Sequence, residues 1–171
     1  MLEWAAALPA GCEILDLGCG HGRPIGDALA GAGFRLFGVD ASPTLLAAYR
    51  QRFPEAQTEC AAAEESAFFH RTFDAVIAWG LLFLMPPERQ KLLIARVARA
   101  LNPGGRFLFT APEQPITWID SLSQRDSLSL GAPAYIALLQ AEGLRVDGHA
   151  TDEGENFYYL TSKPALRVPR Q

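Results

Sequence analysis

The sequence lacks several features that identify metal-binding, disulfide-rich and membrane-spanning proteins. Among its 171 residues there are three cysteines, Cys12, Cys19 and Cys60, and none of them forms a C-x-x-C pair. This number and spacing predict neither a zinc site nor a disulfide framework, and they favour a reducing, cytoplasmic location. No apolar run approaches the ~20 residues that a membrane-spanning helix needs. We therefore expect a soluble cytoplasmic protein that does not associate with membranes.

Basic residues and histidines are too few or too dispersed to indicate a surface for phosphates or metals. The formal net charge is −4, whereas binding along a nucleic-acid backbone needs clustered lysine and arginine. The three histidines, His21, His70 and His149, lie far apart and predict no metal site. The first ten residues contain Glu3 and no basic leader, which argues against a secretory signal. We expect a small-molecule partner, no nucleic acid, and a monomer or homodimer.

Short runs of β-forming residues alternate with longer helical segments, which is typical of a mainly parallel sheet with helices on both faces. Strands are predicted at residues 13–17, 35–39, 57–60, 73–78, 106–110, 144–150 and 156–162. Helices are predicted to begin at a proline or an N-capping serine, at Pro24, Ser42, Pro86 and Pro133. The length fits one domain over residues 1–171, with a short N-terminal segment at 1–12 and a loose tail at 164–171.

Residues 112–130 do not share this alternation. They contain Pro112, Pro115, Trp118 and several serines without a helical or strand period. A loop of this length inside a compact domain is usually functional or mobile. We expect a flap over the functional site, with a plain surface loop as the alternative.

The most specific pattern joins a glycine-rich turn to an acidic residue about 20 residues further on. Gly18, Gly20 and Gly22 follow the first predicted strand, and Asp40 ends the second. Glycines there let a ligand approach the backbone, and the next helix presents unpaired N–H groups at the same place. A carboxylate ending the neighbouring strand accepts hydrogen bonds from ribose hydroxyls at the same edge of the sheet. The G-x-G-x-G spacing differs from the G-x-G-x-x-G of pyrophosphate binding, which favours an adenosine ligand over a nicotinamide dinucleotide.

Four motifs in this order resemble those of the class I S-adenosylmethionine-dependent methyltransferase family, and the resemblance runs from about residue 13 to residue 163. They are the Leu15–Gly22 turn, Asp40, the strand Phe73–Ala78 and the turn Leu101–Gly105. The resemblance implies an α/β, doubly wound, Rossmann-like domain. Its sheet would have seven mostly parallel strands in the order 3-2-1-4-5-7-6, with a terminal antiparallel hairpin. It also implies S-adenosyl-L-methionine as the cofactor and S-adenosyl-L-homocysteine as the product.

The same resemblance implies which residues hold the cofactor. These are Asp16, Gly18, Cys19, Gly20, Gly22, Asp40, Ala41, Ala63, Glu64 and Trp79. Family members commonly have an aspartate after the third strand that binds the adenine amino group, and this sequence has alanine there. Glu64 and backbone amides are the two candidates for that contact.

The sequence identifies no catalytic residue. The candidates are Trp79, Glu113, Trp118 and His21. Trp79 either stacks on a ligand or packs in the core. His21 either contacts the cofactor, acts as a base or is a solvated loop residue. Glu113 and Trp118 follow the fifth strand, on the side where an acceptor is expected. The hairpin formed by the last two strands is expected to lie far from the cofactor, with its aromatic residues in the core.

We therefore expect methyl transfer from S-adenosylmethionine to an unidentified small-molecule acceptor. Such a displacement mainly requires that donor and acceptor are aligned. The sequence offers no His–carboxylate pair at a recognisable spacing, which favours an acceptor that is already nucleophilic. The alternative is a non-catalytic S-adenosylmethionine-binding sensor or partner subunit.

Overall fold

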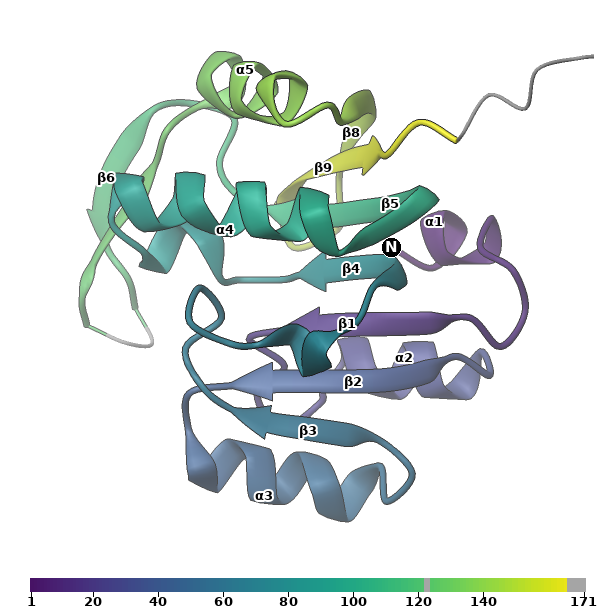
Figure 1. Ribbon diagram of the computed structural model, residues 1–171. Coiled ribbons are helices and arrows are strands. Elements are labelled where there is room, and N and C mark those ends of the chain that lie inside the picture. Colours follow the sequence, from purple (N-terminus) through teal and green to yellow (C-terminus); the bar gives the residue numbers. More distant parts are fainter. Residues whose placement is uncertain (122–123, 166–171) are drawn as a thin grey trace, which may run out of the picture.

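The computed structural model describes residues 1–121 and 124–165, and its core is one seven-stranded sheet (Figure 1). The strands are β1 Glu13–Leu17, β2 Arg35–Asp40, β3 Gln57–Cys60, β4 Phe73–Ala78, β5 Leu101–Thr110, β8 Arg145–Thr151 and β9 Phe157–Ser162. Their order is β3-β2-β1-β4-β5-β9-β8, and β9 is antiparallel to both of its neighbours. The two strands of an additional hairpin shift the labels of the last pair, and the order is otherwise the one that the resemblance implies. The predicted fold class and terminal hairpin are confirmed.

Helices cover both faces of the sheet. They are α1 Leu2–Ala6, α2 Ile25–Gly31, α3 Pro43–Arg52, α4 Pro87–Ala100 and α5 Ala132–Ala141, with short 3-10 helices η1 Phe68–His70 and η2 Leu82–Leu84. Because side chains alternate along a strand, Leu15 of β1 faces the core under α4 and α5, while Ile14 faces the core under α2 and α3. The sheet is thereby buried between two apolar layers, as a parallel sheet requires.

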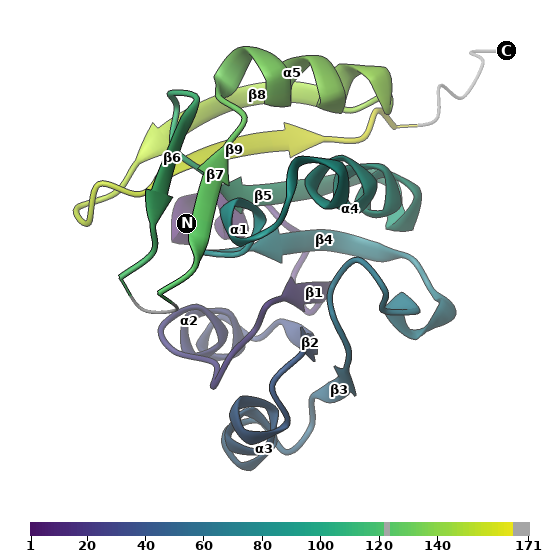
Figure 2. The same ribbon diagram turned by 90° about the vertical axis from the view of Figure 1, so that its left-hand side faces the viewer.

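The helices begin at the prolines and the serine that the sequence indicates as helix starts. Pro24 immediately precedes α2, and Pro87 is the first residue of α4. Ser42 caps α3, and its hydroxyl accepts a hydrogen bond from the Leu45 N–H at 3.3 Å. These signals fix where each helix leaves the carboxyl edge of the sheet, which faces the viewer in Figure 2.

Residues 112–121 and 124–130 contain two strands, so the expectation of a loop without regular structure is wrong. They form a two-stranded antiparallel sheet, β6 Ile116–Ile119 and β7 Asp126–Ser129, in front of the carboxyl edge of the main sheet (Figure 2). Ser127 and Ser129 are buried, and the Gln90 amide of α4 donates a hydrogen bond to a β7 carbonyl at 2.9 Å. The serines that suggested a loop are small side chains that let β7 pack closely.

The ends of the chain are described to different extents. The segment at 1–12 contains α1, whose Trp4 packs in the core beside Cys12. Of the tail predicted at 164–171, residues 166–171 lie outside the described residues.

Candidate functional site

The glycine turn after β1 is held against the end of β2 by a set of backbone hydrogen bonds. The N–H groups of Gly18 and Cys19 both donate to the Val39 carbonyl, at 2.8 and 3.1 Å. The Gly20 N–H donates to Oδ2 of Asp40 at 2.8 Å. Gly18 and Gly20 have φ of +68° and +54°, which side-chain-bearing residues rarely adopt. The two motifs that lie 20 residues apart in the sequence therefore form one structural unit.

The three glycines of the turn serve different purposes. A Cβ on Gly22 would collide with the ring of Phe53, the residue that follows α3, so this glycine is required by the packing of Phe53 against the turn. A Cβ on Gly18 would lie 3.0 Å from Leu81. A Cβ on Gly20 would meet nothing within 4 Å. Gly20 is thus the glycine whose bare backbone faces open space where a ligand would lie.

Asp40 is half-buried and keeps capacity for further hydrogen bonds. Its Oδ2 accepts from Gly20 and its Oδ1 accepts from the Ser42 N–H, both at 2.8 Å. An ionised carboxylate offers about four acceptor sites, so roughly two remain. This number matches the two hydroxyls of a ribose.

Asp16 is a buried carboxylate at the end of β1, and its Oδ2 has no hydrogen-bond partner among the described residues. Burial, with a smaller contribution from the nearby charge of Asp40, raises the pKa of Asp16 to about 7. Buried polar groups without a partner are rare and generally mark a bound water, ion or ligand. A cationic ligand group beside Asp16 would satisfy this carboxylate and favour its ionised form.

Two of the other predicted cofactor residues flank the turn without offering a charged group. The thiol of Cys19 points beneath the turn, where a Cβ on Gly38 would lie 3.0 Å from its sulfur. Burial raises the pKa of this thiol, so it stays protonated and is no nucleophile. Ala41 is exposed immediately after Asp40.

Glu64, one of the two candidates for the adenine contact, already forms an ion pair within the protein. Glu64 is buried and forms an ion pair with Arg89 of α4, which also contacts Glu65 at 3.5 Å. Its carboxylate therefore already has a partner. Ala63 is buried beside it and offers only backbone groups. Because the Glu64 carboxylate is paired with Arg89, the geometry favours backbone groups for the adenine contact.

Trp79, directly after β4, is half-buried and packs on the terminal hairpin. Its ring lies 5.7 Å from that of Tyr158, at a tilt of 39°. The following Gly80 N–H donates to the Thr110 hydroxyl at 2.7 Å, which joins the ends of β4 and β5. The structure thus favours the packing interpretation of Trp79.

A cavity of about 320 Å³ lies at the carboxyl end of β5. Its wall residues come from η2, the end of β5, the β6–β7 hairpin and the start of β9, and they are Phe83, Thr110, Ala111, Pro112, Glu113, Trp118, Glu155, Asn156 and Phe157. Trp118 packs against Phe83 with ring centroids 5.3 Å apart. Two of the sequence candidates, Glu113 and Trp118, therefore meet at one cavity, next to the strand end that Gly80 joins to β4.

The cavity also contains residues that the sequence analysis did not single out. The turn of the terminal hairpin and the first residue of β9 line this cavity, because β9 runs antiparallel to β5 and starts beside the end of β5. The Ala111 N–H donates to the Phe157 carbonyl at 3.1 Å. The sequence did contain a signal for this proximity: the resemblance implies that the last strand is antiparallel, and such a strand starts where β5 ends, which places Asn156 and Phe157 here.

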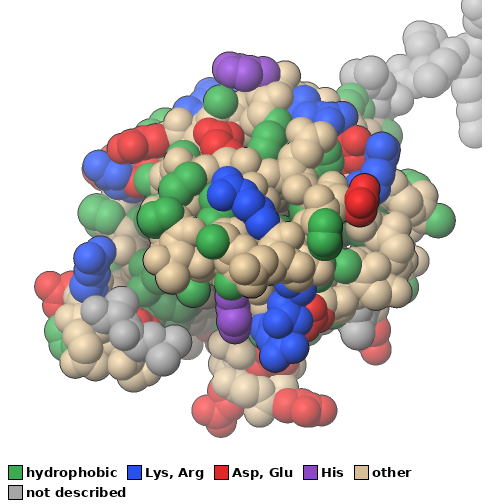
Figure 3. All heavy atoms as spheres, turned by 90° about the horizontal axis from the view of Figure 1, so that it is seen from below, with side chains coloured by type: hydrophobic (Ala, Val, Ile, Leu, Met, Phe, Trp, Pro, Cys, Tyr) green, Lys and Arg blue, Asp and Glu red, His purple; other side chains and the backbone are tan. Residues whose placement is uncertain are grey.

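The histidines do not gather at this edge. His21 is exposed in the glycine turn, His70 lies in η1, and His149 stacks on Phe157 with centroids 5.0 Å apart. Within residues 1–121 and 124–165, no group of three or more His, Cys, Asp or Glu is arranged to hold a metal ion. Over the same residues, no helix is long and apolar enough to cross a membrane. On the face drawn in Figure 3, basic and acidic side chains are interspersed.

With this geometry in view, comparison with known proteins identifies the family. The family model described as "Methyltransferase domain" matches residues 14–105, which is more than half of the chain. The chain belongs to the class I S-adenosylmethionine-dependent methyltransferase family.

Individual relatives are similar over much of this chain but are longer than it. An uncharacterized methyltransferase from Synechocystis sp. is 34% identical over 113 residues, covering 66% of this chain and 53% of the relative. A trans-aconitate 2-methyltransferase from Variovorax paradoxus is 30% identical over 159 residues, covering 82% and 60%. The chain thus spans about half to three fifths of the length of these two relatives.

Among solved structures, the fold is similar to that of the 1,6-didemethyltoxoflavin-N1-methyltransferase of Burkholderia thailandensis, crystallised with 1,6-didemethyltoxoflavin and S-adenosylhomocysteine. The TM-score is 0.76 at 23% identity, and the match covers 96% of this chain and 76% of that one. At this identity the likeness shows the fold alone.

Proposed function

We propose that this chain binds S-adenosylmethionine at the glycine turn and catalyses transfer of its methyl group to a small-molecule acceptor. The observation that carries the proposal is the set of three groups at one edge of the sheet: the open backbone of Gly20, the acceptor sites left on Asp40 and the unpartnered carboxylate of Asp16. Membership of the methyltransferase family supports the same function.

Each of these groups fits a different part of the cofactor. Asp40 has acceptor capacity for the ribose hydroxyls, and Gly20 has no side chain that would exclude a ligand from the turn. Asp16 provides a negative charge for a cationic group, since the cofactor carries both an ammonium and a sulfonium. When bound, the cofactor supplies an electrophilic methyl group on a sulfonium that is already a good leaving group.

The protein's own contribution to such a reaction is alignment. The cavity beside the end of β5 lies on the same edge as the glycine turn, and Thr110 connects it to the loop after β4. Holding donor and acceptor in a reactive geometry replaces a bimolecular encounter and is worth up to roughly 7–11 kcal/mol. One relative and one protein of similar fold are named for acceptors as different as trans-aconitate and 1,6-didemethyltoxoflavin, so the acceptor class has to be inferred from this cavity.

The test is a transfer assay with methyl-labelled S-adenosylmethionine and a fractionated metabolite mixture. We expect S-adenosylhomocysteine to form together with a labelled product in one fraction, and Asp40→Ala to reduce both about tenfold or more at cofactor concentrations below saturation. Tight binding of S-adenosylmethionine without turnover in any fraction would contradict the catalytic proposal and support the sensor alternative.

A further inference from the structure

The cavity at the end of β5 differs from the cofactor site in chemistry, and its walls indicate which acceptors fit it. Three aromatic side chains line it, Phe83, Trp118 and Phe157. Phe83 and Trp118 contact each other, and the Phe157 ring stacks on that of His149. Fixed aromatic walls favour a planar or aromatic ligand, because ring contacts add to the apolar area that is buried.

Most polar groups of the wall already have partners. The Asn156 amide donates to the carboxylate of Asp152 at 3.0 and 3.1 Å. The Thr110 hydroxyl accepts from the Gly80 N–H. The Thr110 O–H and the Trp118 indole N–H remain as neutral donors.

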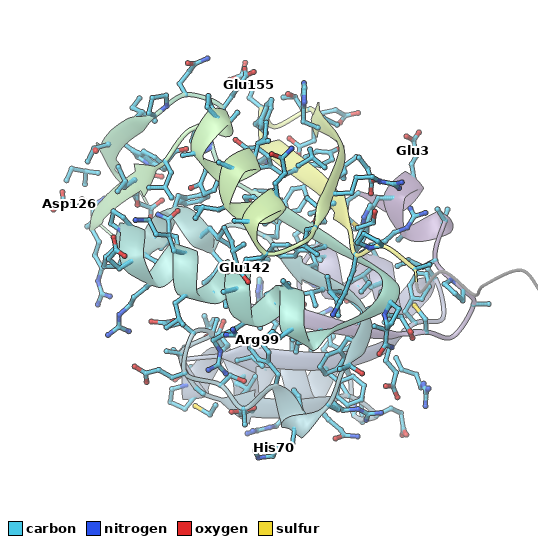
Figure 4. All side chains as sticks on the ribbon, turned by 45° about the horizontal axis from the view of Figure 1, so that its top comes forward. Glu3, His70, Arg99, Asp126, Glu142 and Glu155 are labelled. Atoms are coloured by element: carbon cyan, nitrogen blue, oxygen red, sulfur yellow. The ribbon has the colours of Figure 1, made fainter. Side chains whose placement is uncertain are left out.

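Two carboxylates are the charged groups of the wall. Glu113 lies in the wall directly after β5, and Glu155 lies at the outer end of the β8–β9 connection (Figure 4). Neither carboxylate forms a hydrogen bond or ion pair with the described residues, and no lysine or arginine lines the cavity. The charged groups of this wall therefore carry only negative charge and only accept hydrogen bonds.

Resting on the methyl-transfer function proposed above, we propose that the acceptor is an aromatic molecule that carries a protonated amine. The amine donates hydrogen bonds to Glu113, with Glu155 adding to the negative field at the rim. The aromatic part lies between Trp118 and Phe157, whose ring faces also attract a cation. A carboxylate or phosphate in the same place would face like charges without a counterion.

The experiment compares three probes that share one ring and differ in charge: tryptamine, indole-3-ethanol and indole-3-acetate. Their affinities are measured by calorimetry on the full chain saturated with S-adenosylhomocysteine. We expect tryptamine to bind about tenfold more tightly than the alcohol and the acid to bind most weakly, since exposed charge pairs and cation–π contacts each contribute a few-fold. The preference should shrink between low and high salt.

The variants separate recognition from general effects. Glu113→Gln should reduce the preference for tryptamine over the alcohol about two- to fivefold, because Glu113 is exposed and its pair is screened. Glu153→Gln, which removes a charge from the same hairpin turn outside the cavity wall, should leave the preference unchanged. Both variants should bind S-adenosylhomocysteine like the unmodified chain.

Equal or tighter binding of the alcohol or the acid would overturn the amine proposal, as would failure of all three probes to bind. Either result leaves cofactor binding intact and the proposed function standing. Failure of the chain to bind S-adenosylhomocysteine would instead refute the proposed function, and the acceptor proposal with it.

Discussion

Replacing Asp16 with asparagine should stabilise the free protein and weaken cofactor binding at the same time. The carboxylate is fully buried without a partner for Oδ2, and its pKa is raised from 3.8 to about 7. A group whose pKa is raised by folding contributes its stability below its unfolded pKa and loses it as the pH rises through its folded pKa. Asparagine has a similar shape and stays neutral throughout.

The size of the effect follows from that pKa. A rise from 3.8 to about 7 corresponds to about 4 kcal/mol, because a tenfold change in a proton equilibrium is about 1.4 kcal/mol. The free energy of unfolding of Asp16→Asn should therefore exceed that of the unmodified chain by up to about 4 kcal/mol above pH 7. The difference should decline steadily toward pH 4.

The assay is urea unfolding of both proteins at pH 5, 6, 7 and 8, with and without S-adenosylmethionine. In the unmodified chain, a cationic cofactor group should lower the pKa of Asp16, so affinity should rise from pH 6 to pH 8 with release of a proton. Calorimetry in buffers of different ionisation enthalpy detects that proton. A difference in stability that does not change with pH, or an affinity that falls as the pH rises, would refute the reasoning.

Three further predictions concern individual side chains. Gly20→Ala should weaken S-adenosylmethionine binding more than tenfold in a calorimetric titration. Gly33→Ala, at a glycine that also has a positive φ and open surroundings, should lower only the melting temperature, and equal effects on binding would contradict a ligand at Gly20. Gly22→Ala should destabilise the fold through its collision with Phe53 and should lower the urea midpoint. An unchanged midpoint would show that Phe53 can move to accommodate the methyl group. Trp118→Ala should reduce acceptor affinity more than cofactor affinity. A lower melting temperature with unchanged acceptor binding would show that Trp118 has only a structural role. In the free, unmodified protein, the β7 amides should already be protected from hydrogen exchange.

The fold could be predicted because its determinants are local. Proline and serine at the helix starts, glycines after β1 and an apolar β4 each act within a few residues, and the structure follows them closely. The hairpin β6–β7 could not be predicted in this way. Ser127 and Ser129 are polar in sequence, and only their packing beside α4 makes them buried strand residues.

The candidate site also contains features that could be predicted from the sequence and features that could not. Asp40 and the glycine turn come together because adjacent parallel strands end at one edge, which the spacing already implies. The partner of Glu64 could not be predicted, since Arg89 lies 25 residues away and reaches it through the placement of α4. The cavity wall at Phe83 and Asn156 likewise depends on four segments whose proximity is set by tertiary packing.

Calorimetric titration of S-adenosylmethionine into the unmodified chain and into Asp40→Ala tests the central claim most directly. The carboxylate would make two hydrogen bonds to the ribose, each worth roughly 1.5–3 kcal/mol, so we predict one-site binding that weakens at least tenfold in the variant. Glu142→Ala, which removes an exposed carboxylate at the end of α5, should bind like the unmodified chain. Unchanged affinity in a folded Asp40→Ala variant, or binding of NAD in place of S-adenosylmethionine, would contradict the account.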